Sequence, residues 1–310
     1  MWFIFAFTTM VAWGFADLFY KKGADRKDPY SHLKTAMMVG FIMGAHAIYV
    51  LLFDNIDYDF SNILVYAPVS AMYILSMTVG YFGLRYLELS ISSPIQNASG
   101  AVVAVMCMVF LGQTLDFVSG LAVVLICSGV FSLGVFEKHS ITQAQKAGNE
   151  KYTRSFIAFL IPVLYCIIDS LGTFFDAYYL DDVTQTPLRN VTEDTFEMVA
   201  NTSYELTFLL CAIAIFIFLK VVKKEKIGIM EQKDRGIAAV FETIGQFAYV
   251  FALSGNGVVA APMVAAYCIV SLILSRIVIK ERLEKKQYIS IVLVVVGIII
   301  MGIMEGLETV

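Results

Sequence analysis

Charged side chains are scarce in this chain of 310 residues. Asp, Glu, Lys and Arg make up 15% of it, whereas a globular domain usually has about a quarter of its residues charged. Hydrophobic residues make up 59%. They come in blocks of roughly 20 residues, the length that crosses a hydrocarbon core of about 30 Å. This composition excludes a soluble globular domain and predicts an all-α protein that crosses the lipid bilayer many times.

Metal-binding and catalytic motifs are also lacking. The chain has three histidines and five cysteines, and the cysteines all fall within apolar blocks without forming a C-x-x-C pair. We therefore expect no disulfide framework, no metal site and no cofactor. The motifs G-x-S-x-G and H-E-x-x-H are absent, which argues against a membrane-embedded enzyme. The absence of a G-x-x-x-x-G-K-[ST] loop argues against a nucleotide-driven pump. No nucleic-acid partner is expected.

The apolar blocks predict ten transmembrane helices, at 2–20, 33–53, 62–83, 88–111, 117–136, 155–180, 203–219, 236–254, 257–278 and 287–304. Of the 22 Lys and Arg residues, 21 then lie in or beside the connections on one side, and only Arg189 lies on the other. Basic connections stay in the cytoplasm, so we expect both termini outside. Sequons at Asn190 and Asn201 would matter only in a eukaryotic secretory membrane. The short termini favour a multi-pass protein of the bacterial plasma (inner) membrane.

The two halves of the chain resemble each other. A shift of 168 residues lays 71–134 over 239–302 without a gap, and Pro94 then coincides with Pro262 and Gly129 with Gly297. Each half holds five spans, and because five is odd, the second copy enters the membrane upside down. Inverted repeats that meet at a midplane site are a recurring transporter plan. The predicted organisation is a first repeat at 1–136, a cytoplasmic connection at 137–154, and a second repeat at 155–305 with an outer loop at 181–202.

A family resemblance lies at the end of the second half, in KERLEKKQYISIVLVVVGIIIMG (280–302). It resembles the "ERL, then Gln, then Gly" signature of the EamA-like branch of the drug/metabolite transporter superfamily, and the matching positions are Glu281, Arg282, Leu283, Gln287 and Gly297. Trp13–Gly14 in the first span also looks like that family. The resemblance covers essentially the whole chain and implies a transporter of small organic metabolites with a central cavity. The first repeat departs from the pattern, with Gln113 where a glutamate is usual.

Four carboxylates lie well inside the predicted spans: Asp17, Asp169, Asp176 and Glu242. An ionisable residue near the bilayer centre costs at least about 2.5–3.5 kcal/mol and usually has a function. Asp169 and Glu242 are the deepest. Asp17 and Asp176 lie nearer the ends of their spans, so an interfacial position is the competing explanation for them. All four are candidates for coupling transport to an ion.

Helical spacing places other polar residues on the same faces as these acids. Asp169, Thr173 and Asp176 share one face, Glu242, Gln246 and Tyr249 a second, and Thr9, Trp13 and Asp17 a third. Hydrogen bonds between helices would also explain such stripes, but Asn and Thr make them without the cost of a charge. The acids therefore favour a cavity. The candidate substrate-binding residues are Trp13, Tyr73, Gln96, Asn97, Asp169, Thr173, Glu242, Gln246 and Tyr267.

The segment SISSPIQNASG (90–100) interrupts the fourth predicted span. Pro94 has no backbone N–H and its ring displaces the preceding turn, so it is predicted to kink or break the helix. Pro262 repeats this in the second half. We expect the two prolines to act as hinges, and Gln96 and Asn97 to offer polar contacts to a ligand at the break.

Basic residues are missing from the centre of the spans, with His46 as the one exception. Acids without fixed cations suit a cationic or zwitterionic cargo, protons, or both, and argue against phosphorylated cargo. We therefore expect a secondary transporter that moves a small amine-bearing or zwitterionic metabolite by alternating access. A channel-like passive facilitator of small polar solutes is the alternative. It would need a continuous polar pore, whereas the polar stripes cluster near the midplane. The sequence assigns no oligomeric state and no coupling ion.

Overall fold

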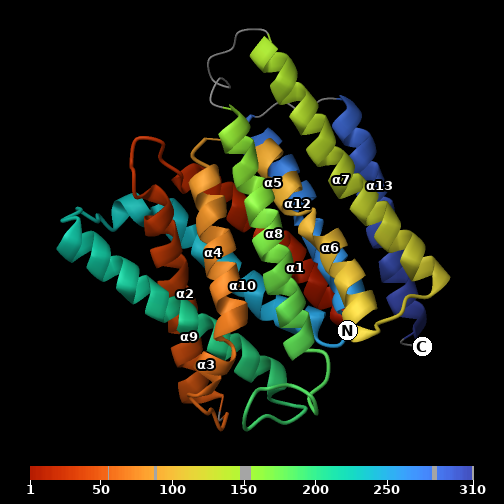
Figure 1. Ribbon diagram of the computed structural model, residues 1–310, viewed down its shortest axis with the longest axis horizontal. Helices are drawn as coiled ribbons and strands as arrows, with labels where there is room; N and C mark the ends of the chain where they lie inside the picture. The colour runs from red at the N-terminus through yellow and green to blue at the C-terminus, as the bar shows by residue number, and fades with distance from the viewer. Residues whose placement is uncertain (55, 87–88, 147–154, 281–284, 309–310) are drawn as a thin grey trace.

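The computed structural model describes residues 1–310 except 55, 87–88, 147–154, 281–284 and 309–310 (Figure 1). The described part is largely helical and contains no strand. Eight helical segments in it are long and apolar enough to cross a membrane: Trp2–Gly23, Ser31–Phe53, Ser92–Leu111, Leu160–Tyr179, Phe196–Val222, Met230–Leu253, Gly257–Ile279 and Lys285–Met304. The expected all-helical, multi-pass membrane protein is confirmed, with eight candidate spans where ten were predicted.

The predicted span 62–83 is divided in two. A short α3 (Asn62–Val65) is followed by α4 (Ala67–Gly83). Pro68 lies in the first turn of α4, where its missing N–H would have no partner inside the helix anyway. A new helix therefore starts at this proline.

The predicted span 117–136 is part of a longer helix, α7 (Phe117–Lys146). The first part of the predicted connection 137–154, up to Lys146, is therefore helical. The rest of that connection, 147–154, lies outside the described residues, as do positions 281–283 of the family signature.

The remaining unbroken helices lie close to their predicted positions. Their bounds are α1 (Trp2–Gly23), α2 (Ser31–Phe53), α8 (Ser155–Tyr179), α9 (Phe196–Ile217), η3 (Phe218–Val222), η4 (Met230–Gln232), α10 (Lys233–Leu253) and α13 (Lys285–Glu308). The largest shift is at α9, which begins at Phe196 where 203 was predicted. The polar residues just before position 203 are buried against neighbouring helices, and Asn201 is only 1% exposed.

Two helices are broken after a proline, as predicted. Pro94 lies inside α5 (Leu89–Gln96), which is followed by α6 (Ser99–Met106). Pro262 lies inside α11 (Gly257–Ala265), which is followed by α12 (Tyr267–Leu274). Each proline removes one helical hydrogen bond and crowds the preceding turn, and each first segment ends within one turn of its proline.

The segments that follow the two breaks also have the same local structure when one half is shifted by 168 residues onto the other. The π-helical turn η1 (Cys107–Leu111) maps onto the π-helical turn η5 (Ser275–Ile279). Each is followed by a left-handed residue, Gly112 with φ +67° and Lys280 with φ +63°. The sequence similarity therefore extends to backbone conformation in this part of the two halves.

Glycines let the helices pack in close pairs, α2 against α9 and α7 against α13. A Cβ atom on Gly40 would lie 2.2 Å from the carbonyl oxygen of Phe208, and one on Gly129 would lie 2.4 Å from Val294 Cγ2. Both distances are too short for any side chain, so these glycines permit the contact. The α7–α13 pair runs along one edge of the bundle, and the start of α1 and the end of α13 lie at the same end of it (Figure 1).

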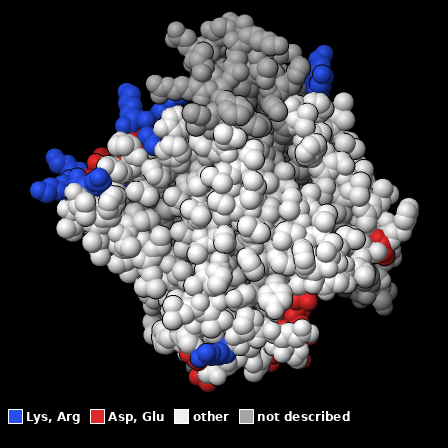
Figure 2. All heavy atoms as spheres, in the orientation of Figure 1, with Lys and Arg blue, Asp and Glu red and all other residues white. Residues whose placement is uncertain are grey.

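Charged side chains gather at the two ends of the bundle. Figure 2 shows most Lys and Arg side chains at one end, Asp and Glu at the other, and a broad uncharged flank between them. Such a flank suits contact with lipid tails, and the ends suit the two aqueous sides.

Candidate functional site

A cavity lies among the helices that surround the two breaks. Side chains from α1, α4, α8, α9 and α10 and from both broken helices line it. All nine residues predicted to bind substrate lie around this one cavity: Trp13, Tyr73, Gln96, Asn97, Asp169, Thr173, Glu242, Gln246 and Tyr267. Their role in binding remains a prediction.

Asp17 on α1 lines the cavity and is bonded to both broken helices. Its Oδ2 atom accepts a hydrogen bond of 2.7 Å from Ser93 on α5 and one of 2.8 Å from Ser271 on α12. The side chain is 8% exposed. The two serines hold the carboxylate in place and leave Oδ1 without a donor among the described residues.

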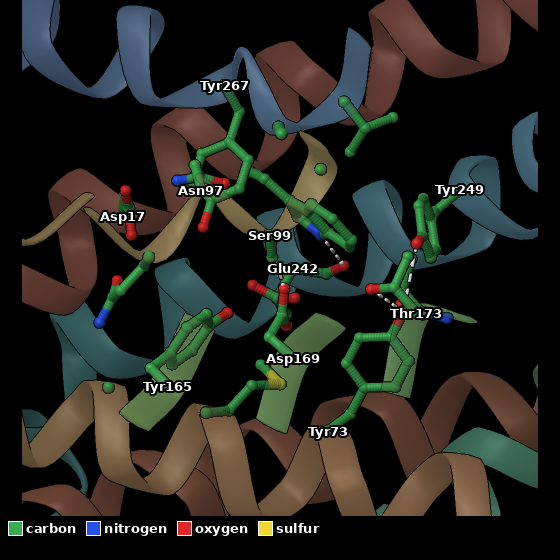
Figure 3. A pocket seen from close by; sticks show the side chains of 18 of the residues that line it. Asp17, Tyr73, Asn97, Ser99, Tyr165, Asp169, Thr173, Glu242, Tyr249 and Tyr267 are labelled. Atoms are coloured by element: carbon green, nitrogen blue, oxygen red, sulfur yellow. Dashed lines mark hydrogen bonds between the residues drawn. The ribbon is translucent and has the colours of Figure 1, made fainter. Parts of the chain in front are cut away.

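Asp169 on α8 is the most accessible acid of the cavity, being half-buried where the other two are buried. On the opposite face of α8, Ile167 and Leu171 are exposed on the apolar flank, so the helix presents Asp169 inward. Ser99 on α6 donates a hydrogen bond of 2.8 Å to its Oδ2 atom (Figure 3).

Glu242 on α10 is the third acid of the cavity and is 7% exposed. The hydroxyl of Tyr20 donates a hydrogen bond of 3.1 Å to Glu242 Oε2. The indole N–H of Trp13 points at the backbone carbonyl of Glu242, at 3.4 Å. Residues on α1 thus fix both the side chain and the backbone of this position.

Asp176 lies outside the cavity. It is fully buried and accepts a hydrogen bond from the hydroxyl of Tyr66. Seven residues of helix advance about 10 Å, so the polar face shared with Asp169 extends beyond the cavity. Thr9 on α1 also lies outside the cavity. Its hydroxyl donates a hydrogen bond of 3.0 Å to the carbonyl of Gly245. The coupling role predicted for Asp176 remains a prediction.

Aromatic rings form much of the cavity wall. The ring of Trp13 lies 5.0 Å from that of Tyr249 and 5.8 Å from that of Tyr267. The hydroxyl of Tyr73 is within hydrogen-bond distance of Thr173 Oγ1, at 2.9 Å, and of the Tyr249 hydroxyl, at 3.1 Å (Figure 3). These contacts join α1, α4, α8, α10 and α12 around the site.

Several lining residues were not predicted as site residues. They are Tyr20, Tyr81, Tyr165, Tyr204, Tyr249 and Ser99, together with small and aliphatic side chains. Tyr165 precedes Asp169 by four residues, and Tyr249 follows Glu242 by seven, so both share a helix face with a predicted acid. Tyr249 had been placed on the face of Glu242 without being counted as a site residue, and the same spacing from Asp169 would have found Tyr165.

Two glutamine side chains of the cavity wall have unsatisfied atoms. Gln96 Nε2 and Gln246 Oε1 are buried and have no hydrogen-bond partner among the described residues. Asn97 instead donates to the carbonyl of Ser93, at 2.8 Å. Buried polar atoms are nearly always bonded, so the unpaired amide atoms indicate a polar occupant or ordered water.

No Lys, Arg or His side chain lines the cavity in the described part of the chain. His46 instead forms an ion pair with Glu205 on α9, with Nδ1 2.8 Å from Oε2. Glu205 is fully buried and is a fifth acid inside the helical bundle, one that was not predicted from the sequence. It was missed because the predicted span started at 203, which placed this residue at a helix end.

A multi-pass helical protein with a polar cavity between two broken helices has the architecture of a membrane transporter. The family model described as "EamA-like transporter family" matches residues 1–135 and 191–303. The chain belongs to this family and so to the drug/metabolite transporter superfamily, as its sequence signature indicated. It is therefore a membrane transporter.

The fold is also shared with solved structures, of which 26 chains match. One, described only as "Crystal structure of protein", superimposes with a TM-score of 0.63 at 14% identity, covering 97% of this chain and 96% of its own. At this identity the likeness concerns the fold alone. No curated protein sequence matches the chain.

Proposed function

We propose that the protein is a secondary transporter that carries a small amine-bearing or zwitterionic metabolite across the membrane by alternating access. The charge of the cavity carries this proposal. Asp17, Asp169 and Glu242 line it, and no basic side chain does so among the described residues. A carboxylate away from water is costly unless a positive charge or several donors compensate it. A cargo with an ammonium group supplies that charge.

Protons are the second means of neutralising these acids, and we propose that they exchange with the cargo. In the cavity without cargo, protons compensate the carboxylates. An ammonium group that enters beside Asp169 displaces a proton, and its departure lets the proton return. Each carboxylate accepts hydrogen bonds from neutral hydroxyls of Ser or Tyr. These hydroxyls can bond to the carboxyl group in both its protonated and its ionised form.

Alternating access would follow from two inverted five-helix repeats that move at the breaks after Pro94 and Pro262. The corresponding π-helical turns 168 residues apart support the repeats. The breaks also meet at the cavity, because a Cβ atom on Gly100 would lie 2.6 Å from Ala265 Cβ. A change of angle at either break would therefore alter the cavity wall.

A channel-like facilitator is less well supported. It needs a continuous polar path, yet the polar face of α8 leaves the cavity after Thr173, and Asp176 beyond it is fully buried. Toward that end Asn62 and Arg189 also join the two halves, through hydrogen bonds of 2.9 and 2.8 Å. These contacts favour a carrier with a closed end.

The proposal is tested by binding and counterflow. A thermal-shift screen of amines, amino acids, nucleosides and sugars should stabilise the purified protein only with amine-bearing compounds, since saturation at about 100 times Kd adds about 2.7 kcal/mol. The best ligand should then show saturable uptake and counterflow in proteoliposomes. Asp169→Asn should weaken both, whereas Asp116→Asn, at an exposed carboxylate, should not. Stabilisation by neutral or anionic compounds alone would refute the proposal.

A further inference from the structure

Three acids line the cavity, and a single ammonium group balances the charge of only one of them. They come from three helices, α1, α8 and α10. Among the described residues, every group that donates a hydrogen bond to their carboxylates is a neutral hydroxyl. One ammonium group would leave at least one further carboxylate to be balanced by other means.

Two of the acids have an unused acceptor. Asp17 Oδ1 and Glu242 Oε1 receive no hydrogen bond from the described residues, because the bonds from serine and tyrosine go to the other oxygen of each carboxylate. Figure 3 shows Asp17 beside Asn97, with Glu242 and Asp169 nearer the middle of the view. An acceptor is thus available on α1 and another on α10.

The wall of the cavity suits an alkyl chain. Trp13 and seven tyrosines line the cavity together with Ala261, Val264 and Ala265. Methylene groups pack on aromatic faces, and ammonium groups are attracted to them. The buried Gln246 Oε1, which lacks a donor among the described residues, can accept a further N–H bond.

We propose that the cargo carries at least two ammonium groups joined by an alkyl chain, as in α,ω-diamines and longer polyamines. One ammonium group binds Asp17, and another binds Glu242 or Asp169, with the chain along the aromatic wall. This inference rests on the proposed transport of amines and narrows it to one chemical class.

The test compares matched ligands on the purified full-length protein by calorimetry. Butane-1,4-diamine, butylamine and 4-aminobutyric acid share a chain length but differ in charge. The diamine should bind at least ~10-fold more tightly than butylamine, a difference of about 1.4 kcal/mol. Butylamine or 4-aminobutyric acid binding as tightly as the diamine would refute the inference and leave the proposed function intact. Binding of none of the three, with binding of a non-amine, would refute the proposed function itself.

A variant locates the second ammonium group. Asp17→Asn keeps an acceptor for Ser93 and Ser271. It should lower the affinity for the diamine by ~10-fold and leave the affinity for butylamine unchanged. Equal weakening of both ligands would refute the assignment of Asp17. Asp116→Asn serves as the control for loss of a carboxylate outside the cavity. If Asp17→Asn does not fold, the wild-type ligand series decides the inference by itself.

Discussion

Ser93 on α5 and Ser271 on α12 donate hydrogen bonds to the same oxygen, Oδ2 of Asp17 on α1, at 2.7 and 2.8 Å. One carboxylate oxygen therefore joins two helices that belong to different halves of the chain and that are both broken after a proline. Any motion that separates the broken helices must give up at least one of these bonds.

This arrangement predicts that Ser93→Ala and Ser271→Ala each lower stability and change transport. Each should lower the free energy of unfolding by about 0.6–2 kcal/mol, the range for hydrogen bonds between membrane helices, and each should alter the transport rate. Thermal melting and proteoliposome uptake measure the two effects. Ser132→Ala is the matched control, because its hydroxyl bonds Ser290 across α7 and α13 at 2.6 Å, away from the cavity. It should affect stability alone, and normal transport in both cavity variants would contradict the prediction.

The hinges can be tested with a third proline as control. Pro94→Ala and Pro262→Ala should restore a continuous helix and slow turnover more than they weaken binding, because the break is needed for motion and not for contact. Pro162 lies inside α8, which continues through it, so Pro162→Ala should leave turnover near the wild-type value. Unchanged turnover in both hinge variants, measured by counterflow, would leave these prolines as packing features.

The ion pair of His46 and Glu205, with Nδ1 2.8 Å from Oε2, predicts a stability effect without a binding effect. His46→Leu should destabilise the protein by about 3–5 kcal/mol, because it leaves Glu205 buried without its partner. Adding Glu205→Leu should recover much of this loss. Thermal melting of the single and double variants measures their stability, and ligand titration of the same variants measures their affinity for cargo. Reduced cargo affinity in the double variant would contradict the separation of this pair from the cavity.

Helical periodicity explains how much of the site was predictable. Asp169 and Thr173 share a helix face, and inward-facing acids on different helices of one bundle converge on the same interior. Periodicity does not say where along a face the cavity ends, so Asp176 was grouped with residues that it does not join. Glu205 was missed for a different reason: the polar residues before it are buried by tertiary contacts that no local pattern records. The breaks followed from proline chemistry, but the π-helical turns beyond them did not.

The orientation of the bundle predicts which end is accessible from outside the cell. In a variant without native cysteines, a single cysteine at Gln185 should react with an impermeant thiol reagent in intact cells. One at Lys226, at the basic end, should react only after the membrane is opened, because basic connections stay in the cytoplasm. Both positions are exposed in the structure, so access to the reagent depends on sidedness alone. The reverse pattern of labelling would invert the topology.

The acids of the cavity predict the pH dependence of transport. Asp169→Asn and Glu242→Gln keep the side-chain shape and the acceptors for Ser99 and Tyr20 but remove the site that exchanges a proton for cargo. At least one of them should abolish the pH dependence of uptake while the protein stays folded. Asp169 is the stronger candidate because it is the most accessible of the three acids. Uptake between pH 5.5 and 8.5, about 1.5 units either side of neutrality, measures this in proteoliposomes. Asp116→Asn should retain the wild-type profile, and normal pH dependence in both cavity variants would show that the acids serve structure and that transport is not coupled to protons through them.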